Sequence, residues 1–433
     1  MTFACPAHEA CLTIYGPVVP SRFLVDITPL RVSRDYRLLL TGQTVSWLGR
    51  QLTIVAVPIQ VFDMTGSSFA VGLVGAAALG PLIVLSLAGG SIADAVDRRK
   101  LLIVTQLLLA LTSAGLALNA QRDAPALWPL YVLSAATAGF SGVDLPARNA
   151  MLPRLVGRDL LTSAAALGQL VFQVGGVAGP ALAGVLISQV NVAAAYWIDV
   201  VTFGVSAAMV VLMKPQPPEG GGTRAGLASV REGLRYLKGR RVLDSTFVID
   251  LNAMVFGMPR ALFPALGTEF FGGGPTTVGL LFAAPGAGAM LGALFTGWVS
   301  RVRRQGLAVI VAVAVWGAAI ALFGLVPWLP LALFLLAVAG AADVVSAVFR
   351  NTILQLSVPD ALRGRLSAVH IAVVTSGPRL GDVEAGAVAA VTSAQFSVVS
   401  GGIACMLGVL AVHAWAPGLA RYERNPAPVD SDP

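Results

Sequence analysis

The sequence predicts an all-α, polytopic membrane protein with twelve transmembrane helices in two six-helix bundles, and three observations carry this prediction. The 433-residue chain is 56% hydrophobic and only 12% charged, whereas a soluble domain is about 25% charged. Apolar stretches of about 20 residues recur along the chain, and each is long enough to cross a bilayer. They lack the alternation of β-barrel strands. Finally, a similar motif occurs in both halves, at Arg148 and Arg350.

The apolar stretches give the boundaries of the predicted elements. The first six spans are 38–62, 69–93, 101–120, 127–146, 161–187 and 193–213, and the second six are 243–266, 277–298, 307–326, 329–349, 366–390 and 396–415. They divide the chain into a leader (1–36), a first bundle (37–213), a linker (214–242), a second bundle (243–416) and a tail (417–433). The linker begins rich in Pro and Gly. Apolar residues at helical spacing then predict an amphipathic helix on the membrane surface, namely Leu227, Val230, Leu234 and Leu237.

The basic residues predict the orientation in the membrane. If the leader lies inside, 25 of the 29 lysines and arginines fall in the leader, the linker, the tail and the loops on the same side. Cytoplasmic loops carry this excess of positive charge. Residues 1–34 lack the apolar core of a signal peptide. We therefore expect a multi-pass protein of the inner or plasma membrane with both termini in the cytoplasm.

An internal repeat supports the division into two bundles. The stretch "ARNAMLPRLVGRDLL" begins at Ala147, and "FRNTILQLSVPDALRGR" begins at Phe349. Each follows the fourth span of its half, and the two are 202 residues apart. Both contain Arg-Asn, an apolar pair, a proline and further basic residues. Two six-span units in the same orientation are typical of parallel-repeat transporters.

Several other functions find no support in the sequence. The net charge of +7 comes from short basic patches between spans, so no nucleic-acid partner is expected. Three cysteines imply no disulfide framework, and the stretch "CPAHEAC" around His8 is not expected to bind a metal. An integral-membrane enzyme or receptor is the rival class. It would need a nucleophile–base pair or a metal cluster, and the histidines are scattered. No cofactor is expected, and no Gly-rich loop for ATP is present.

The loop after the second span carries a family motif, "GGSIADAVDRRKLL", from Gly89. It resembles the loop signature of the major facilitator superfamily, Gly-x-Leu-Ala-Asp-Arg-x-Gly-Arg-Arg. The matching positions include four that we take as a cytoplasmic gating loop, Gly90, Asp94, Arg98 and Arg99. Ala95 and Asp97 depart from the signature. The resemblance implies that this loop latches the two bundles together. The alternative is a basic anchor at the end of a span.

The fifth span contains "GGVAGPALAG", which resembles the fifth-helix motif of superfamily antiporters. Its key residues are Gly175, Gly179, Pro180 and Gly184. The glycines permit close helix approach, and a proline bends a helix. The resemblance implies export, although a packed, kinked helix is the simpler interpretation.

The second half resembles the enterobactin-exporter branch of the superfamily, which also includes macrolide and multidrug exporters. The similar stretches are "RALFPALG" from Arg260, "VGLLFAAPGAGAMLGALFTGW" from Val278 and the "RNTILQ" run from Arg350. With the first-half motifs, the resemblance covers about residues 36–415. It implies a monomeric secondary exporter whose bundles rock around a midplane cavity, with a small-molecule substrate, a proton and the lipid bilayer as partners. We expect a siderophore as substrate. The alternatives are a multidrug or macrolide pump, and an importer.

Charged residues within the spans predict where this cavity lies. Seven fall well inside spans: Arg50, Asp250, Arg260, Asp343, Arg379, Asp382 and Glu384. Each costs roughly 2.5–3.5 kcal/mol at the bilayer centre. Together they would cost about 15–25 kcal/mol if they faced lipid, more than the usual stability of a protein. We therefore expect them to face one another or water, with Gln169 and Gln173 adding hydrogen bonds.

Individual roles follow from spacing and chemistry. Arg379 and Asp382 are three residues apart and share a helix face, so we expect Arg379 to pair with Asp382 or with a carboxylate across the cavity. Asp382, Glu384 or Asp250 is expected to exchange protons; the alternative is a static ion pair. Arg50 would attract an anionic substrate or form a salt bridge to the other bundle. Asp199, two turns inside the sixth span, is expected to make a cap or loop contact.

Overall fold

The predicted helices are present in the computed structural model, which describes residues 26–217, 235, 237, 239–358 and 360–423. The first half contains α1 (Thr28–Val32), α2 (Arg34–Thr65), α3 (Ser68–Ala95), α4 (Arg98–Ala120), α5 (Trp128–Val156), α6 (Leu161–Gln189) and α7 (Val192–Val211). The second contains α9 (Arg241–Phe256), η1 (Arg260–Leu262), α10 (Phe263–Ala265), the π-helical η2 (Leu266–Phe270), α11 (Pro275–Leu294), η3 (Thr296–Arg301), α12 (Gln305–Phe323), α13 (Leu329–Ser357), α14 (Asp360–Val391), α15 (Ala394–Trp415) and α16 (Pro417–Ala420). No β-strand occurs in the described residues.

Each of the twelve predicted spans falls on one or more of these helical segments, which confirms the all-α polytopic fold. Ten helices in the described part of the chain are long and apolar enough to cross a membrane. The other two long helices, α5 and α14, carry charges within their length, such as Asp144 and Arg379. Large apolar side chains project from the outside of the helices, for example Leu111 (66% exposed) and Phe334 (61% exposed). Such a surface suits a hydrocarbon environment.

Local sequence signals fix where the helices begin. The side chains of Ser33, Ser67, Asp97, Asn191 and Ser393 accept hydrogen bonds from backbone N–H groups of the first turns of α2, α3, α4, α7 and α15. These are favoured N-cap residues because they satisfy otherwise unpaired N–H groups. Gly66 ends α2 in the left-handed region, at φ 61°, where glycine carries no steric penalty. Short turns of this kind keep consecutive helices antiparallel.

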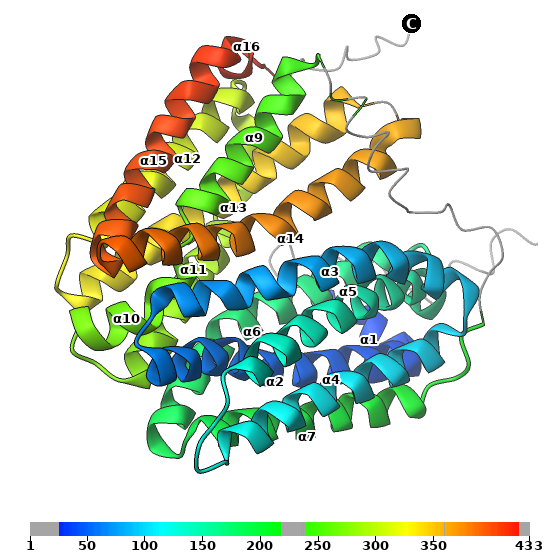
Figure 1. Cartoon of the computed structure of the whole chain (residues 1–433). Coiled ribbons are helices and arrows are strands. Elements are labelled where there is room, and N and C mark those ends of the chain that lie inside the picture. The colour runs from blue at the N-terminus through cyan, green and yellow to red at the C-terminus, as the bar shows by residue number, and fades with distance from the viewer. Residues whose placement is uncertain (1–25, 218–234, 236, 238, 359, 424–433) are drawn as a thin grey trace, which may run out of the picture.

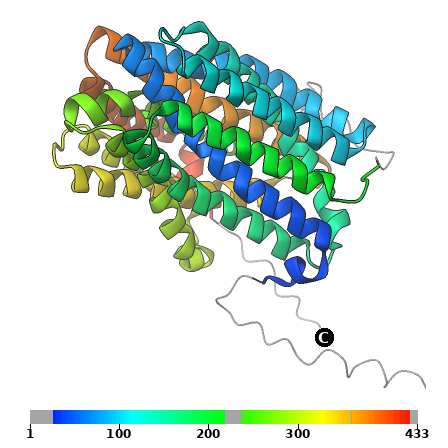
Figure 2. The ribbon, with the colours of Figure 1, turned by 90° about the horizontal axis from the view of Figure 1, so that it is seen from below.

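The helices form two bundles, α2–α7 and α9–α15, which Figure 1 shows as the lower and upper halves of the molecule. Viewed from below, the first bundle lies in front of the second (Figure 2). Between the bundles, the main contacts join α3 to α14 and α6 to α11. These two helix pairs hold corresponding positions in the two halves, because α3 and α11 are the second helices of their bundles and α6 and α14 are the fifth. The parallel repeat therefore gives a pseudo-symmetric interface.

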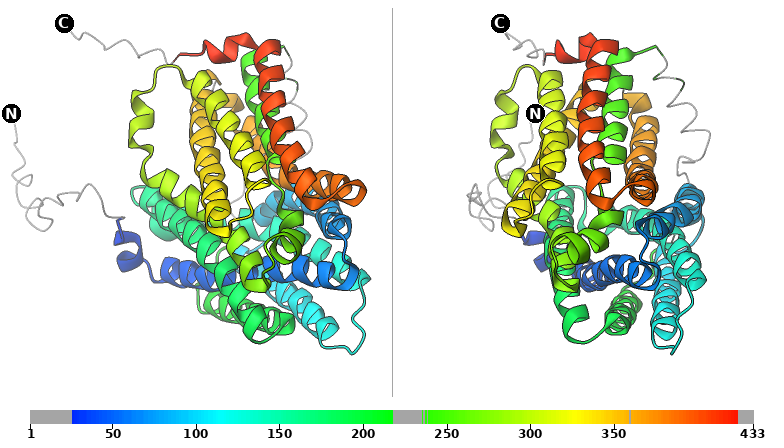
Figure 3. Two further views of the ribbon diagram at one scale, coloured as in Figure 1. Left: turned by 90° about the vertical axis from the view of Figure 1, so that its left-hand side faces the viewer. Right: turned by 60° about the vertical axis from the view of Figure 1, so that its left-hand side comes forward.

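The bundles meet at one end and diverge at the other. We call the end where α7 stops and α9 starts the linker end. Away from it, the start of α3 packs on the end of α14, since a Cβ on Gly386 would lie 2.7 Å from the Ser68 carbonyl oxygen. Likewise, a Cβ on Gly184 would lie 2.6 Å from the Pro275 carbonyl oxygen. Towards the linker end α14 diverges from α3, as Figure 1 shows. Figure 3 views the molecule from the opposite end, where the two helices lie side by side.

Several predicted boundaries require correction. The seventh span is not one helix, because α9 ends at Phe256 and the chain continues through η1, α10 and η2. The fourth and tenth helices extend to Val156 and Ser357, so Arg148 and Arg350 lie inside helices and not in loops. Residues 26–36 of the predicted leader already contain α1 and the first turn of α2. The predicted amphipathic helix falls largely outside the described residues, as do Cys5, His8 and Cys11.

Candidate functional site

Two adjoining chambers lie between the bundles. The first has a volume of about 330 Å³ and the second about 250 Å³, and both are lined by Ile54, Arg260 and Phe282. Helices α2 and α6 supply the first-bundle wall of the first chamber, and segments from Gly257 to Val344 supply the other wall. The second chamber lies among α2, α3, α4, α5, η1 and α14. Together the two chambers form a central cavity with walls from both repeats.

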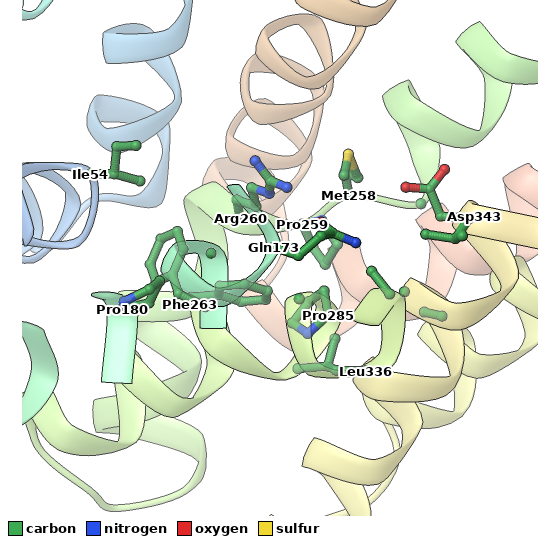
Figure 4. A pocket seen from close by; sticks show the side chains of 18 of the residues that line it. Ile54, Gln173, Pro180, Met258, Pro259, Arg260, Phe263, Pro285, Leu336 and Asp343 are labelled. Atoms are coloured by element: carbon green, nitrogen blue, oxygen red, sulfur yellow. The ribbon is translucent and has the colours of Figure 1, made fainter. Parts of the chain in front are cut away.

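The interruption after α9 places Arg260 in both chambers. Proline lacks an N–H and disfavours helical conformation in the residue before it, so Pro259 accounts for the end of the helix just upstream. The Trp316 side chain donates a hydrogen bond to the Gly257 carbonyl oxygen at 2.8 Å, which satisfies a polar group that the helix no longer pairs. Figure 4 shows Arg260 beside this irregular segment, with Pro259 and Met258 next to it.

The second chamber gathers most of the predicted charges. Arg50, Arg260, Arg379 and Asp382 all line it. The Asp382 carboxylate accepts a hydrogen bond from the Ala261 backbone N–H at 3.1 Å, and Arg260 and Arg379 interact with it electrostatically. The Arg379 guanidinium donates to the Thr375 carbonyl oxygen at 2.6 Å in its own helix. Asp382 is therefore held by a backbone donor and two cations, and no ion pair of 4.0 Å or less joins it to Arg379 among the described residues.

The first chamber combines aromatic walls with fewer charges. Trp47 stacks on Phe172 with ring centroids 4.4 Å apart, and its ring N–H donates to the Phe172 carbonyl oxygen at 3.2 Å. Gln173 and Asp343 also line this chamber, and Figure 4 shows both of them with Arg260. The Asp343 side chain is 30% exposed. This chamber can contact planar or apolar groups and offers one carboxylate as a hydrogen-bond acceptor.

Three predicted cavity residues lie elsewhere. Among the described residues, Gln169, Asp250 and Glu384 do not line either chamber. Gln169 is exposed and Glu384 is half-buried. Asp250 is instead buried in an ion pair with Arg350, which joins α9 to α13. Composition and spacing place a charge on a helix, but they do not tell whether its face points to the cavity or to a neighbouring helix of the same bundle.

Asp199 also differs from its expectation, because it is a buried interhelical contact and not a cap or loop residue. Its carboxylate accepts hydrogen bonds from the hydroxyls of Thr53 at 2.7 Å and Ser113 at 2.8 Å. Helices α2, α4 and α7 therefore meet at one carboxylate. Asp199 also interacts electrostatically with Arg50.

Arg148 and Arg350 are buried charged residues that the sequence prediction does not include. The predicted fourth and tenth spans end before them, whereas α5 and α13 extend beyond them. Arg148 forms an ion pair with Asp144 at 2.6 Å within α5, and Arg350 pairs with Asp250 as described. The signal that could have found them was present in the sequence. Both arginines stand in the repeated Arg-Asn motif, 202 residues apart, which marks equivalent positions in the two halves.

The fifth-helix motif provides close helix packing. A Cβ on Gly175 would collide with the Trp47 ring, and one on Gly179 would collide with Gln51 of α2. Gly184 faces the other bundle, where its Cβ would lie 3.0 Å from the Gly279 Cα. Pro180 lines the first chamber. The motif thus holds α6 against α2 and α11 at once, which positions one wall of the cavity.

The loop motif packs within the first bundle. A Cβ on Gly89 would lie 2.8 Å from Val143 of α5. Arg98 donates to the Ala150 carbonyl oxygen at 3.2 Å, and Arg99 donates to Val210 at 3.2 Å. The side chain of Asp94 and the surroundings of Gly90 lie outside the described residues. The predicted latch between the bundles therefore stays a prediction for a conformation in which the linker end is closed.

The fold and the cavity define a class of protein. Two six-helix bundles related by a parallel repeat, with charges from both bundles facing a central cavity, form a transporter of the major facilitator type. Within that class, residues 25–426 match the family model described as transmembrane secretion effector. The chain belongs to this family. In the described residues no group of three or more His, Cys, Asp or Glu is arranged to hold a metal ion.

Comparisons with individual proteins agree with this assignment. The chain is 28% identical over 408 residues to the enterobactin exporter EntS of Shigella boydii and of Escherichia coli O81, covering 94% of this chain and 98% of each relative. Its fold resembles the nucleoside transporter NupG (TM-score 0.69, 12% identity, 90% of this chain and 99% of that one). It also resembles a bacterial homologue of the lysosomal transporter Spinster, in an inward-facing, unoccupied conformation (TM-score 0.69, 14% identity, 91% and 98%).

Proposed function

We propose that the protein exports an amphipathic siderophore from the cytoplasm by alternating access, driven by proton antiport. The observation that carries this proposal is the central cavity, which joins three arginines and two aspartates to a stacked aromatic pair between two separable bundles. The similarity to enterobactin exporters over 94% of the chain points to the substrate class.

The distribution of basic residues supports a cytoplasmic linker end. On that orientation the bundles diverge towards the cytoplasm, and their contacts near Gly184 and Gly386 close the outer side. This is the conformation that would accept a substrate made inside the cell. The cavity is built by a single chain, which supports a monomeric carrier.

The charge balance separates the siderophore from a drug-like cation. Arg50, Arg260 and Arg379 outnumber Asp343 and Asp382 around the cavity, and arginine donates hydrogen bonds to carbonyl, phenolate and carboxylate oxygens. A siderophore is rich in such acceptors. A multidrug or macrolide pump is the second candidate, because the two carboxylates and the Trp47–Phe172 stack would also bind a cationic aromatic compound.

Deletion of the gene under iron limitation tests the proposal. Mass spectrometry of retained and secreted metabolites is expected to show a siderophore held back in the cells, with secretion restored by the wild-type chain but not by Arg260→Gln. Gln169→Ala is the control, because Gln169 lies on α6, a helix that forms part of the cavity wall, but lines neither chamber. Unchanged siderophore secretion together with increased drug sensitivity would overturn the siderophore assignment in favour of the pump.

Energy coupling is tested in everted membrane vesicles. Uptake of the purified siderophore is expected when the vesicle interior is acidic, and an ionophore that exchanges K⁺ for H⁺ is expected to abolish it. Uptake that persists without a pH gradient contradicts proton antiport.

A further inference from the structure

A buried ion pair behind the cavity wall carries a further inference. Asp250 of α9 and Arg350 of α13 pair with side chains only 2% and 3% exposed. Among the described residues, neither the Asp250 Oδ1 nor the Arg350 Nη1 has a hydrogen-bond partner elsewhere. The two groups therefore depend on each other, and the pair fixes the α9–α13 contact without touching the cavity.

Asp343 connects this pair to the cavity. It lies seven residues before Arg350, two turns away on the same face of α13. Its carboxylate lines the first chamber, and its Oδ1 lies 4.0 Å from the Arg350 Nη2. Arg350 thus stands between one carboxylate that is sealed from solvent and another that is 30% exposed to the cavity.

The other charged or titratable groups around Asp343 are few. Arg260 interacts with it electrostatically across the chamber, and Asp250 is the group that α9 directs towards Arg350. His370 of α14 interacts with Arg350. The remaining neighbours of α13, namely α11 and α12, contain no titratable side chain. A change in the charge of Asp343 therefore acts mainly on two arginines, Arg260 in the cavity and Arg350 behind its wall.

Asp382, the other cavity carboxylate, is held differently. Each of the two carboxylates has two arginine neighbours, but Asp382 also accepts a hydrogen bond from the Ala261 backbone N–H at 3.1 Å, and such a bond favours the charged form. Asp343 accepts no hydrogen bond within the described residues and has free oxygen lone pairs towards the chamber. Of the two, Asp343 is the carboxylate open to either a proton or a donor group of a substrate.

We propose that Asp343 is the residue at which proton and substrate compete, and that Arg350 is its positioning residue, which transmits the charge of Asp343 to the α9–α13 contact through Asp250. The proposal rests on the proposed antiport. When Asp343 carries the proton, Arg350 pairs with Asp250 alone. The proton of Asp343 then leaves to the cytoplasm, and a substrate hydroxyl or amide N–H donates a hydrogen bond to the carboxylate. In this charged state of Asp343, Arg350 is shared between Asp250 and Asp343.

The test measures conformation against pH in the absence of any substrate. The full chain, with its three native cysteines replaced, carries spin labels at R158C and R303C, two exposed positions at the linker end of different bundles. Distances between the labels are recorded in lipid nanodiscs from acidic to alkaline pH. We expect the wild-type distribution to shift with pH, and Asp343→Asn to show the acidic distribution at every pH. Asp343→Glu, which keeps a carboxyl group, is expected to keep a shift with a displaced midpoint.

Four further variants test which residues are responsible for the shift. Asp382→Asn and His370→Gln are expected to retain the shift, Arg350→Gln to lose it, and Arg350→Lys to recover it in part because the positive charge is restored. The proposal is overturned by a wild-type chain without a pH-dependent shift, by Asp343→Asn that shifts like the wild type, or by loss of the shift in Asp382→Asn or His370→Gln. Since no substrate is added, failure of the siderophore assignment would leave these distances unchanged.

Discussion

Arg148 and Arg350 hold equivalent positions in the two repeats, yet they are paired in different ways. Arg148 binds Asp144 four residues earlier in its own helix, at 2.6 Å. Arg350 binds Asp250 on a different helix and lies 4.0 Å from Asp343, which faces the cavity. In the first bundle the carboxylate has further donors, Gln106 at 2.7 Å and Thr105 at 3.1 Å, both from α4.

The difference shows how a duplicated fold divides its tasks. The first-bundle pair lies within one helix: α5 supplies both charges, and α4 donates two hydrogen bonds to the Asp144 carboxylate. Its link to the cavity is the electrostatic interaction of both members with Arg50, which lines the second chamber. The second-bundle pair joins two helices and has a neighbour at the cavity wall. A change of charge at Asp343 can therefore act on a contact between two helices of the second bundle, whereas the first-bundle pair joins residues of a single helix.

Removal of Arg350 is expected to have the largest effect. Arg350→Met leaves Asp250 buried without a partner, which should destabilise the protein by roughly 3–5 kcal/mol. Thermal unfolding of the purified chain in detergent measures this loss. The double variant Asp250→Leu/Arg350→Met removes both charges and is expected to regain most of the stability. A double variant as unstable as the single one would show that lost packing, and not the unpaired charge, is the cause.

The equivalent change in the first bundle is expected to cost less. Arg148→Met leaves Asp144 with two hydrogen-bond donors from α4, so the loss should be about 1.5–3 kcal/mol, the range for one hydrogen bond to a charged group. The same unfolding assay compares it directly with Arg350→Met. Equal losses at the two positions would contradict the difference between the repeats. The pH-dependent label distance is expected to persist in Arg148→Met.

A substitution at the interface between the bundles is expected to have a smaller effect, and only on the conformation in which the outer end is closed. A Cβ on Gly72 would collide with the backbone carbonyl oxygen of Asp382, whereas nothing lies within 4 Å of a Cβ on Gly80 of the same helix. Gly72→Ala is therefore expected to disfavour the closed outer end by about 1–3 kcal/mol. Gly80→Ala should be neutral or slightly stabilising, because alanine favours helix. Labels at the outer ends of α3 and α14 measure the distance. An unchanged distance in Gly72→Ala would show that this contact does not hold the outer end closed.

The sequence predicts the helices and the presence of charged groups between them, but it does not predict which partner each charged group contacts. Arg50, Arg260, Asp343, Arg379 and Asp382 line the two chambers, and the high cost of exposing a charge to lipid is the physical reason to look for them there. Their partners were not predictable. Asp382 is bound by a backbone N–H that is free only because the chain breaks near Pro259, and a backbone donor leaves no signature in residue type.

The predicted ends of helices are wrong where polar residues follow an apolar run. Arg350 and Asn351 follow an apolar run, and this pattern predicts a loop, yet α13 continues to Ser357. The continuation is stabilised by Asp250, a residue 100 positions earlier, so only tertiary structure reveals it. The same holds for Asp199, whose two hydroxyl donors come from α2 and α4.

The smallest effect is expected at an exposed pair, which completes the comparison of the buried ones. Arg304 and Glu423 lie 3.2 Å apart with side chains 68% and 55% exposed. Solvent screens such charges, and exposed pairs contribute about 0–1 kcal/mol. Glu423→Gln should thus change the unfolding midpoint little, and raising the salt concentration should abolish the difference from the wild type. The losses in Arg350→Met and Arg148→Met are expected to persist in high salt, since their partners are shielded from ions. A salt-sensitive loss at Arg350 would mean that water reaches the Asp250 pair, and its isolation behind the cavity wall would then be wrong.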